Sequence, residues 1–294
     1  MNNLFERHKK IYKYYGKKFD NNTKHSFTSI FINTNLIKEQ DLIKQLKDNK
    51  ADIKQYFYNS AIVKANFSLA STPQYLSGLY YIQELSSQLC SRALLKPTKD
   101  SITILDMCAS PGGKTINLSV IAPNAKITAI EKFKTRLPAL YTNLNRMLVN
   151  NVDVQVIDAV EATGKYDFIL LDAPCSGNFM NEKQWYNKRK LNDFNNRQKL
   201  QKELLLTAHK VMKKDSILVY STCSLEPEEN EEVIDFALEH FEILDIKDKV
   251  VLENSYPAMT DFEEKKYNPK VKKARRILHN NKFTPFFIAK LRKL

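Results

Sequence analysis

Apolar segments of six or seven residues alternate with helical segments between about residues 100 and 240, and this alternation constrains the fold more than any other feature. The apolar segments are typical of strands and lie at 101–107, 125–130, 152–157, 166–172 and 216–222. The helical segments lie at 114–121, between Glu131 and Leu148, at 197–213 and at 227–240. Apolar strands that alternate with helices form a parallel sheet with helices on both faces. We therefore predict an α/β, Rossmann-like domain in this part of the chain.

Side chains that can take part in binding or catalysis stand at the ends of five of these strands. They are Asp106, Glu131, Asp158, Asp172 and Cys223. Ligands of parallel sheets bind beyond the carboxyl ends of the strands. Because these ends meet at one edge of the sheet, the five residues together predict a ligand site there.

The first hundred residues show no such alternation. They are basic, rich in asparagine and nearly free of glycine, with a helical segment near 38–48 and a short strand at 29–33. We predict a small separate α/β element over residues 1–70, followed by the main domain over residues 71–294.

Positive charge gathers in three segments of the chain. The formal net charge is +13, and Lys and Arg outnumber acids in residues 1–24, 183–199 and 265–276. These segments also carry aromatic side chains, which can stack on bases. Clustered positive charge of this kind favours a nucleic-acid partner.

Several classes of protein are disfavoured by the sequence. No run approaches the ~18 apolar residues of a membrane span, and the basic N-terminus lacks the apolar core of a secretion signal. The four cysteines form no CxxC pair, which argues against a zinc site or a disulfide framework. We expect a cytoplasmic monomer that binds neither a membrane nor a metal.

The segment LDMCASPGGKT, residues 105–115, joins the first strand to the first helix. Its GGKT ending suggests a phosphate-binding loop of an NTPase, but that motif requires glycine where Cys108 stands. The alternative is an adenosine cofactor, with Glu131 accepting hydrogen bonds from the ribose and Asp158 near the adenine amino group. Taken singly, each of these acids is also compatible with a helix cap or a solvated loop.

Three motifs in order carry a family resemblance: DMCASPGGKT, LLDAPCSG and YSTCSLEPEENEEVI. With the segments at 72–89 and 27–46, they resemble the Sun/Fmu-type RNA cytosine-C5 methyltransferases, which use S-adenosylmethionine. The resemblance implies a seven-stranded class I methyltransferase sheet, with residues 286–291 as its antiparallel last strand. The compact chain looks more like the tRNA-acting members, and rRNA stays an alternative substrate. A catalytically silent RNA-binding assembly factor is the alternative of another class.

The resemblance also assigns roles to individual residues. Cys223 looks like the nucleophile, Cys175 like the thiol that helps to release the product, Asp172 like the acid at the ring, and Lys114 like the residue that orients this group. From the residues alone, which thiol attacks stays open. The cofactor, released as S-adenosylhomocysteine, would contact Cys108, Ala109, Ser110, Pro111, Gly112, Gly113, Lys114, Glu131, Arg136, Asp158 and Asp172. The element over 1–70 would contact RNA, and 71–294 would be the methyltransferase domain.

Departures from the family pattern concern RNA contacts. Phe31 stands where arginine is usual, Leu278 precedes His279 where proline is usual, and Thr284-Pro285 replaces a common Asp-Gly. We expect His279 to be structural or to face RNA, and Cys90 to lie in the core. The acidic run at 226–232 is interpreted as the first turn of a helix, where negative charge matches the helix dipole.

Overall fold

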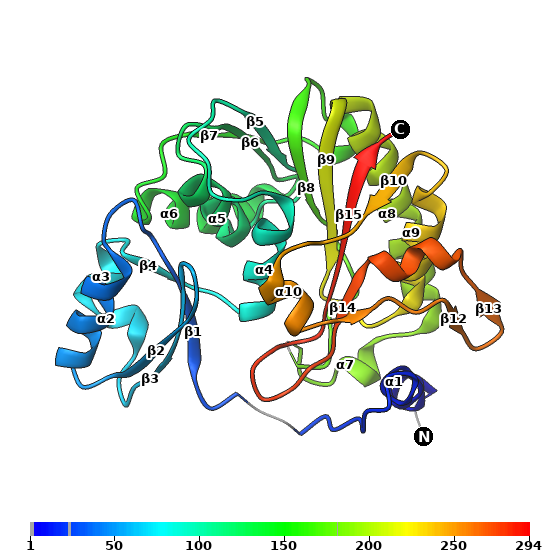
Figure 1. Ribbon diagram of the computed structural model, residues 1–294, viewed down its shortest axis with the longest axis horizontal. Coiled ribbons are helices and arrows are strands. Elements are labelled where there is room, and N and C mark those ends of the chain that lie inside the picture. Colours follow the sequence, from blue (N-terminus) through cyan, green and yellow to red (C-terminus); the bar gives the residue numbers. More distant parts are fainter. Residues whose placement is uncertain (1–2, 23–24, 181) are drawn as a thin grey trace.

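The computed structural model of the chain describes residues 3–22, 25–180 and 182–294. Lys24, one of the cations of the basic segment 1–24, lies outside the described residues. The chain forms a large central sheet with helices on both faces and a smaller sheet beside it (Figure 1). In the described part of the chain, no helix is long and apolar enough to cross a membrane.

The central sheet is built around five parallel strands in the order β7-β6-β5-β8-β9. Their bounds are β5 Thr103–Asp106, β6 Lys126–Ile130, β7 Val152–Gln155, β8 Tyr166–Asp172 and β9 Met212–Thr222. Two further strands follow: β15 pairs antiparallel with β9, and β10 pairs antiparallel with β15, so that β10 runs in the same direction as the five parallel strands. These are β15 Phe286–Lys293 and β10 Phe241–Leu244. The predicted seven-stranded sheet with an antiparallel strand at 286–291 is therefore confirmed.

Two further short strands extend this sheet, so that it has nine strands among the described residues. They are β14 Arg275–Ile277, which pairs with β15, and β11 Tyr256–Pro257, which pairs with β14. A separate hairpin is formed by β12 Asp261–Phe262 and β13 Lys265–Lys266. Short elements nearby are α10 Lys249–Glu253 and η5 Pro269–Lys273.

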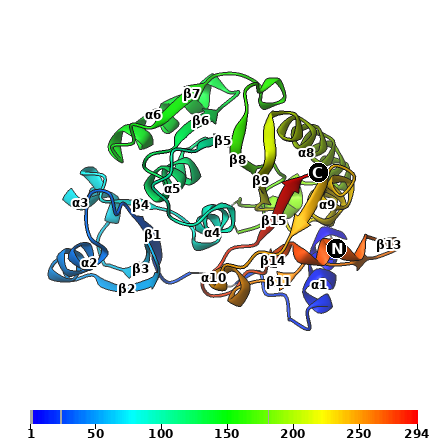
Figure 2. The same cartoon turned by 45° about the horizontal axis from the view of Figure 1, so that its top comes forward.

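Alternate side chains of each central strand enter the two cores of the domain. In β8, Leu170 packs in the core formed with helices α4, α5 and α6, whereas Ile169 and Leu171 pack in the core formed with α8 and α9. These helices are α4 Leu85–Leu94, α5 Gly113–Ile121, α6 Leu137–Arg146, α8 Leu191–Val211 and α9 Glu231–Ala237. Figure 2 shows the two groups of helices on opposite faces of the sheet. A strand buried on both faces must be apolar throughout, which is the pattern that predicted it.

Some element boundaries differ from the prediction. The segment after Glu131 starts with a short turn, η2 Lys134–Arg136, and α6 begins only where Pro138 can occupy a first-turn position. The predicted helix at 227–240 is divided into η4 Pro227–Glu229 and α9. The division falls at Asn230, whose backbone is not helical and whose side chain bonds Thr222 and the Ser224 carbonyl.

The N-terminal part forms a four-stranded sheet in the order β2-β3-β1-β4. Its elements are β1 Thr28–Ile32, α2 Glu39–Asp48, β2 Asp52–Phe57, β3 Ser60–Lys64, η1 Leu69–Ser71, α3 Pro73–Leu76 and β4 Tyr80–Ile82. The expected helix near 38–48 and strand near 29–33 are thus confirmed. Because β4 belongs to this sheet, the sheet extends beyond residue 70, and the division of the chain at that residue stays a prediction.

The first helix, α1 Asn3–Tyr14, does not join this N-terminal sheet. It lies at the other end of the molecule, beside the C-terminal half of the chain (Figures 1 and 2). Its neighbours there include η4 and α7 Trp185–Lys188, through Arg7 and His8.

Candidate active site

The two cysteines singled out in the sequence lie next to each other. Strands β8 and β9 are parallel neighbours, with Asp172 in register with Ser221, so that the loops following them leave the same edge of the sheet. The Sγ atoms of Cys175 and Cys223 are 3.3 Å apart, and both residues are partly exposed. The contact with Cys223, together with burial, raises the pKa of Cys175. The geometry therefore offers two thiols that can act on one bound group.

A charged pair stands beside these thiols. The Lys114 Nζ atom, in the first turn of α5, lies 2.8 Å from Asp172 Oδ2 at the end of β8. Ser221 Oγ donates to the other carboxylate oxygen of Asp172 at 2.8 Å. Burial alone would lower the pKa of Lys114, but the adjacent Asp172 carboxylate holds it above the usual lysine value. Lys114 is therefore an ammonium that fixes the orientation of Asp172.

The loop at 108–113 is shaped by its two glycines. Gly112 has a φ of +104°, which side chains other than glycine rarely adopt. A Cβ atom on Gly113 would lie only 2.8 Å from the ring of Tyr81. Arg136 Nη2 donates to the Ser110 carbonyl at 2.7 Å, which ties the loop to the turn after β6. The loop can thus bring its backbone close to a ligand.

Glu131 and Asp158 line a common cavity of about 110 Å³, whose wall also includes Cys108, Arg136 and Leu200. Glu131 accepts a hydrogen bond from the Phe133 N–H at 2.8 Å and lies 3.3 Å from Arg136 Nη1. Asp158 pairs with Lys132 and accepts from the Val160 N–H at 3.3 Å. Each carboxylate has four acceptor positions, so Glu131 can still accept hydrogen bonds from two neighbouring hydroxyl groups of a ligand.

A second cavity, of about 370 Å³, adjoins the first and shares Cys108 with it. It contains Lys114, Asp172 and the glycine loop, together with side chains that were not predicted as site residues: Tyr81, Gln83, Glu84 and Ser87. The signal was present, since these four lie within the segment at 72–89 that resembles the family, but no role was attached to them. The two cavities thus meet at Cys108, with Glu131 and Asp158 on one side and Lys114 and Asp172 on the other.

Other predicted residues lie away from the two cavities. Asp106 is buried, accepts from Thr115 Oγ1 at 2.7 Å, and has its pKa raised by burial to about 6. Cys90 lies in the core, as predicted, and burial raises its pKa to about 12. His279 is buried and both ring nitrogens are engaged, by Tyr12 and by the Asp20 carbonyl. Among residues 3–22, 25–180 and 182–294, no three His, Cys, Asp or Glu side chains cluster as metal ligands.

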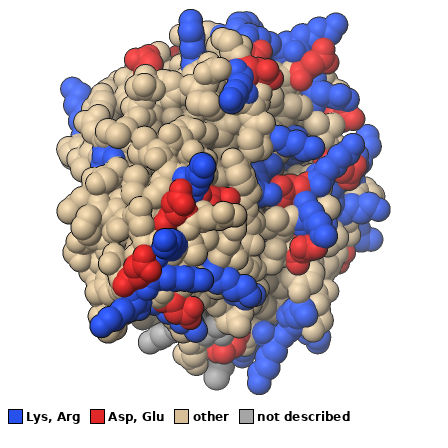
Figure 3. Space-filling view, turned by 60° about the vertical axis from the view of Figure 1, so that its left-hand side comes forward, with Lys and Arg blue, Asp and Glu red and all other residues tan. Residues whose placement is uncertain are grey.

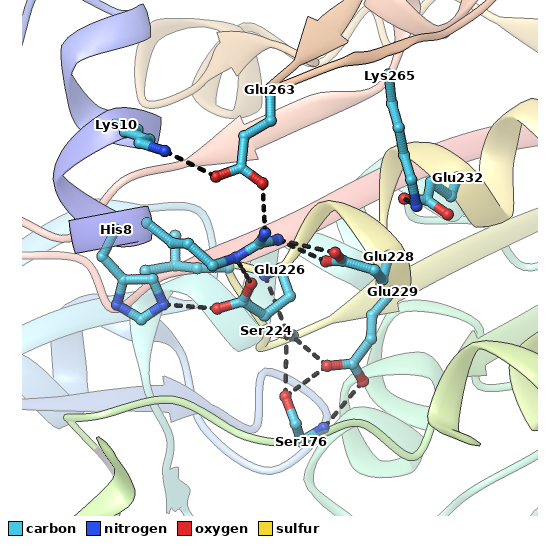
Figure 4. A network of polar contacts seen from close by, with 12 residues as sticks. His8, Lys10, Ser176, Ser224, Glu226, Glu228, Glu229, Glu232, Glu263 and Lys265 are labelled. Carbon is cyan, nitrogen blue, oxygen red and sulfur yellow. Dashed lines mark hydrogen bonds and ion pairs between the residues drawn. The ribbon is translucent and has the colours of Figure 1, made fainter. Parts of the chain in front are cut away.

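The interpretation of the acidic run at 226–232 was incomplete. Glu231 and Glu232 do stand in the first turn of α9, but Glu226, Glu228 and Glu229 precede that helix and are buried. Figure 4 shows that His8 of α1 points at Glu226, and that Ser176 and Ser224, the residues after the two thiols, point at Glu229. The sequence did show that five of the seven residues at 226–232, shortly after the strand that precedes Cys223, are glutamates.

Glu226 is held from two sides by α1. Arg7 Nε lies 3.2 Å from Glu226 Oε2, and His8 Nε2 lies 2.9 Å from Glu226 Oε1. Arg7 also contacts Glu228 at 2.8 Å and Glu263 at 2.8 Å. The acidic run is therefore an anchor for the N-terminal helix.

The assignment of whole basic segments to RNA is wrong for two arginines. Arg7 is 4% exposed, and Arg276 is fully buried, where it pairs with Glu231 and donates to the Leu225 carbonyl. Both neutralise buried carboxylates, which composition alone cannot reveal. On the face shown in Figure 3, Lys and Arg side chains lie among Asp and Glu side chains, and a wide area carries none of them.

Comparisons with known proteins identify relatives of this chain. The family model of the 16S rRNA methyltransferase RsmB/F matches residues 92–292. The tRNA (cytosine(49)-C(5))-methyltransferase of Pyrococcus abyssi is 37% identical over 231 residues, which cover 75% of this chain and 72% of that protein. The 25S rRNA (cytosine-C(5))-methyltransferase nop2 of Schizosaccharomyces pombe is 35% identical over 246 residues, 79% of this chain and 40% of that protein.

A solved structure is similar over almost the whole chain. It is that of a methyltransferase homolog protein from Pyrococcus horikoshii, with a TM-score of 0.80, 36% identity, and coverage of 92% of this chain and 88% of that one. By contrast, the chain spans less than half the length of the first curated relatives that it matches, with 40%, 29%, 30% and 42% covered. The matched family model covers most of the central sheet and both thiols, and the chain belongs to the RsmB/F methyltransferase family.

Proposed function

We propose that this protein transfers a methyl group from S-adenosylmethionine to C5 of a cytosine in tRNA, giving 5-methylcytosine. The observation that carries the proposal is the contact between Cys175 and Cys223, 3.3 Å apart, beside the Lys114–Asp172 pair. The choice of tRNA is supported by two archaeal relatives named as tRNA cytosine-C5 methyltransferases, at 37% and 32% identity. Relatives named as rRNA enzymes keep rRNA as the alternative substrate.

The residues present suit the cofactor. Glu131 is only 3% exposed yet lines the smaller cavity, so its carboxylate is suited to accept hydrogen bonds from two ribose hydroxyls. The apolar walls, which include Ile130 and Leu200, suit a purine ring. When bound, S-adenosylmethionine supplies an electrophilic methyl group. Cys108, Arg136, Asp158 and the loop at 109–113 complete the proposed binding set, with Lys114 and Asp172 at the side of the larger cavity.

Cys223 is the proposed nucleophile. Cytosine C5 is a weak nucleophile, and addition of the Cys223 thiolate to C6 gives C5 the electron density that it lacks. After methylation C5 carries both a hydrogen and the methyl group. Loss of that hydrogen as a proton leaves its electron pair to form the C5=C6 double bond, while the C6–S bond breaks and its electrons return to sulfur. Covalent catalysis thus divides one difficult substitution into addition and elimination.

Asp172 and Lys114 are proposed to stabilise the cytosine ring during addition of the thiolate. As the thiolate adds, negative charge develops toward N3, and a carboxyl group placed there stabilises the adduct by hydrogen bonding or protonation. Lys114 keeps Asp172 in place through their 2.8 Å contact. Cys175 assists the elimination that frees Cys223, for which its contact with the nucleophile is suited.

Exposed lysines remain in all three basic segments and are proposed to contact phosphates, together with the element over residues 1–70. They include Lys17, Lys183, Lys190, Lys266 and Lys270. A target base must leave its stack to reach a pocket at the strand ends. Contacts to the RNA phosphates on either side of that base would supply the binding energy for its unstacking, and RNA binding would weaken as the salt concentration rises.

The test incubates Cys175→Ala, Cys223→Ala and the wild type with S-adenosylmethionine and total tRNA or rRNA, followed by denaturing gels. We expect Cys175→Ala to accumulate a protein–RNA adduct that Cys223→Ala cannot form. Cys90→Ala, which removes a core thiol, is the control and should turn over without accumulating an adduct. An adduct that forms with Cys223→Ala but not with Cys175→Ala would mean that Cys175 is the nucleophile and that the two roles are exchanged. No methyl transfer by the wild type and no adduct from any variant would favour a catalytically silent RNA-binding protein.

A further inference from the structure

One buried carboxylate touches both cysteine loops. Glu229 is fully buried, and its Oε1 accepts hydrogen bonds from Ser176 Oγ and, at 2.8 Å, from Ser224 Oγ. Its Oε2 accepts from the Ser176 N–H at 2.9 Å and from Gln201 Nε2 at 3.0 Å. Figure 4 shows the side chain of Glu229 reaching Ser176 and Ser224 from the turn after β9.

The two serines are the residues that directly follow the two thiols in the chain. Ser176 follows Cys175, and Ser224 follows Cys223. A contact to the next residue fixes the peptide unit that carries each cysteine, because only two soft dihedrals separate neighbouring residues. We propose that Glu229 is a positioning residue that holds the loops of Cys175 and Cys223 together and so keeps the two thiols in contact. The inference rests on the proposed function for its catalytic meaning, although the contact itself can be tested without substrate.

Other contacts support the same loops, and two of them, from Asn178 and between the two serines, also run from one loop to the other. Gln201 Nε2 also donates to the Pro174 carbonyl at 3.0 Å, and Asn178 Nδ2 donates to the Cys223 carbonyl at 3.0 Å. The direct contact between Ser176 Oγ and Ser224 Oγ is longer, at 3.3 Å. Glu229 alone among these side chains accepts from the loop of each thiol with both of its oxygens engaged. Its removal should therefore loosen the pair more than removal of either amide.

Burial raises the pKa of Glu229, whereas the hydrogen bonds from Ser176, Ser224 and Gln201 lower it. Four donors converge on its two oxygens, and because an ionised carboxylate accepts hydrogen bonds at both oxygens, this pattern favours the ionised form. The charge adds to the contact with Cys223 and to burial in raising the pKa of Cys175. Glu229 thus also favours the protonated form of Cys175 next to the nucleophile.

The backbone of Glu229 is itself fixed. Tyr220 donates its hydroxyl to the Glu229 carbonyl at 2.6 Å. In the same turn, Glu226 is held by Arg7 and His8 of α1. A positioning group acts well only if its own support is rigid, and these contacts provide that support from two other elements.

The first arm of the test needs neither RNA nor cofactor. Full-length wild type, Glu229→Gln and Glu228→Gln are equilibrated with a series of oxidised and reduced glutathione, and the Cys175–Cys223 disulfide is measured by mass spectrometry of peptides. Glu228→Gln is the matched control, because it makes the same substitution in the same turn, at a carboxylate that bonds Arg7 of α1 and neither of the serines beside the thiols. We expect the control to match the wild type and Glu229→Gln to need a buffer about tenfold more oxidising, as loss of a charged acceptor implies.

A second readout in the same proteins is the pH dependence of Cys175 alkylation in a Cys223→Ser background. Removal of the Glu229 charge should lower the pKa of Cys175, an effect that a loss of general stability would not produce. If Glu229→Gln does not fold, the double variant Ser176→Ala, Ser224→Ala takes its place. It removes the bonds of the two serine hydroxyls to Glu229 and the contact between these hydroxyls. Equal disulfide midpoints and equal Cys175 titrations in all proteins would overturn the inference.

The second arm adds tRNA and S-adenosylmethionine. Glu229→Gln should lower kcat about 100-fold, the scale of a 1 Å misplacement, with a smaller change in KM, and should accumulate adduct as Cys175→Ala does. Unchanged kcat would contradict a positioning role even if the disulfide shifts. If the wild type methylates no RNA while the first arm behaves as expected, the proposed function fails and the positioning of the thiols by Glu229 stands.

Discussion

Replacement of Arg7 by methionine tests whether helix α1 stabilises the domain from within. Arg7 is 4% exposed and bonds three carboxylates: Glu226, Glu228 and Glu263. Methionine keeps much of the side-chain stem and removes the charge, so that the change isolates the electrostatic contribution. If the guanidinium instead served RNA, the free protein would be nearly indifferent to the substitution.

The size of the effect follows from what each carboxylate loses. Glu228 loses two hydrogen bonds, at 2.8 and 2.9 Å, whereas Glu226 keeps His8 and Glu263 keeps Lys10. Removing one member of a buried ion pair destabilises a protein by about 3–5 kcal/mol. Because two of the three carboxylates retain a partner, we expect the lower end, about 3 kcal/mol.

The effect should depend on pH. Burial alone would raise the pKa of Glu226, but His8 and Arg7 hold it below the usual glutamate value. A lowered pKa in the folded state adds stability above the ordinary glutamate range, and that stability is lost as the pH falls through the folded-state pKa. The difference between wild type and Arg7→Met should therefore shrink below about pH 4.

The assay is urea unfolding followed by the fluorescence of Trp185, the single tryptophan, which is 1% exposed and stacks on His8 at 5.3 Å. Lys9→Met is the control, because Lys9 lies on the same helix and pairs with Glu6 at the surface, where a pair contributes at most about 1 kcal/mol. The reasoning is refuted if Arg7→Met destabilises no more than Lys9→Met at neutral pH.

Three further changes probe the site. Lys114→Met should lower kcat about 100-fold with the fold intact by circular dichroism, since it frees Asp172; a change confined to KM would contradict this. Glu131→Gln should weaken S-adenosylmethionine binding about tenfold in calorimetry, and unaltered affinity would remove Glu131 from the cofactor site. Gly112→Ala should lower the melting temperature more than Gly16→Ala. Gly112 has a φ of +104° and Leu140 Cδ1 lies 3.0 Å from the new Cβ, whereas Gly16 has a φ of +63° and no atom within 4 Å. Equal shifts would refute the view that the loop requires glycine at position 112.

The parallel core was predictable because its signal is local. A strand that is buried on both faces must be apolar along its length, and each connection between parallel strands needs a helix. The sequence of residues 101–240 therefore predicted both the strands and the connecting helices. The neighbouring positions of Asp172 and Cys223 followed from the same rule for strand ends. The short strands β11 and β14 carry no such signal, because two or three residues are too few to show a period.

The partners of the acidic run could not be predicted, because they come from distant parts of the chain. Arg7 and Glu226 are separated by 219 positions, and Arg276 and Glu231 by 45. Local sequence shows the charge of such residues and not their burial, so Arg7 and Arg276 were grouped with exposed lysines. The 3.3 Å contact between the thiols was equally inaccessible, since it depends on the course of two loops.

The placement of these charges gives the cysteine loops two unlike sides. Toward the larger cavity, Lys114 and Asp172 remain partly accessible, on the side where the proposed mechanism places the base. On the other side, Glu226, Glu229 and Glu231 are fully buried and bonded to α1, to the serines beside the thiols and to Arg276. Such buried ion pairs are poor sources of net stability, because desolvation offsets much of their attraction. Their value here is geometric. In the proposed mechanism Cys223 adds to the base and Cys175 assists the elimination, so the two thiols must stay in contact, and a carboxylate with four donors holds one geometry where an apolar contact would permit several.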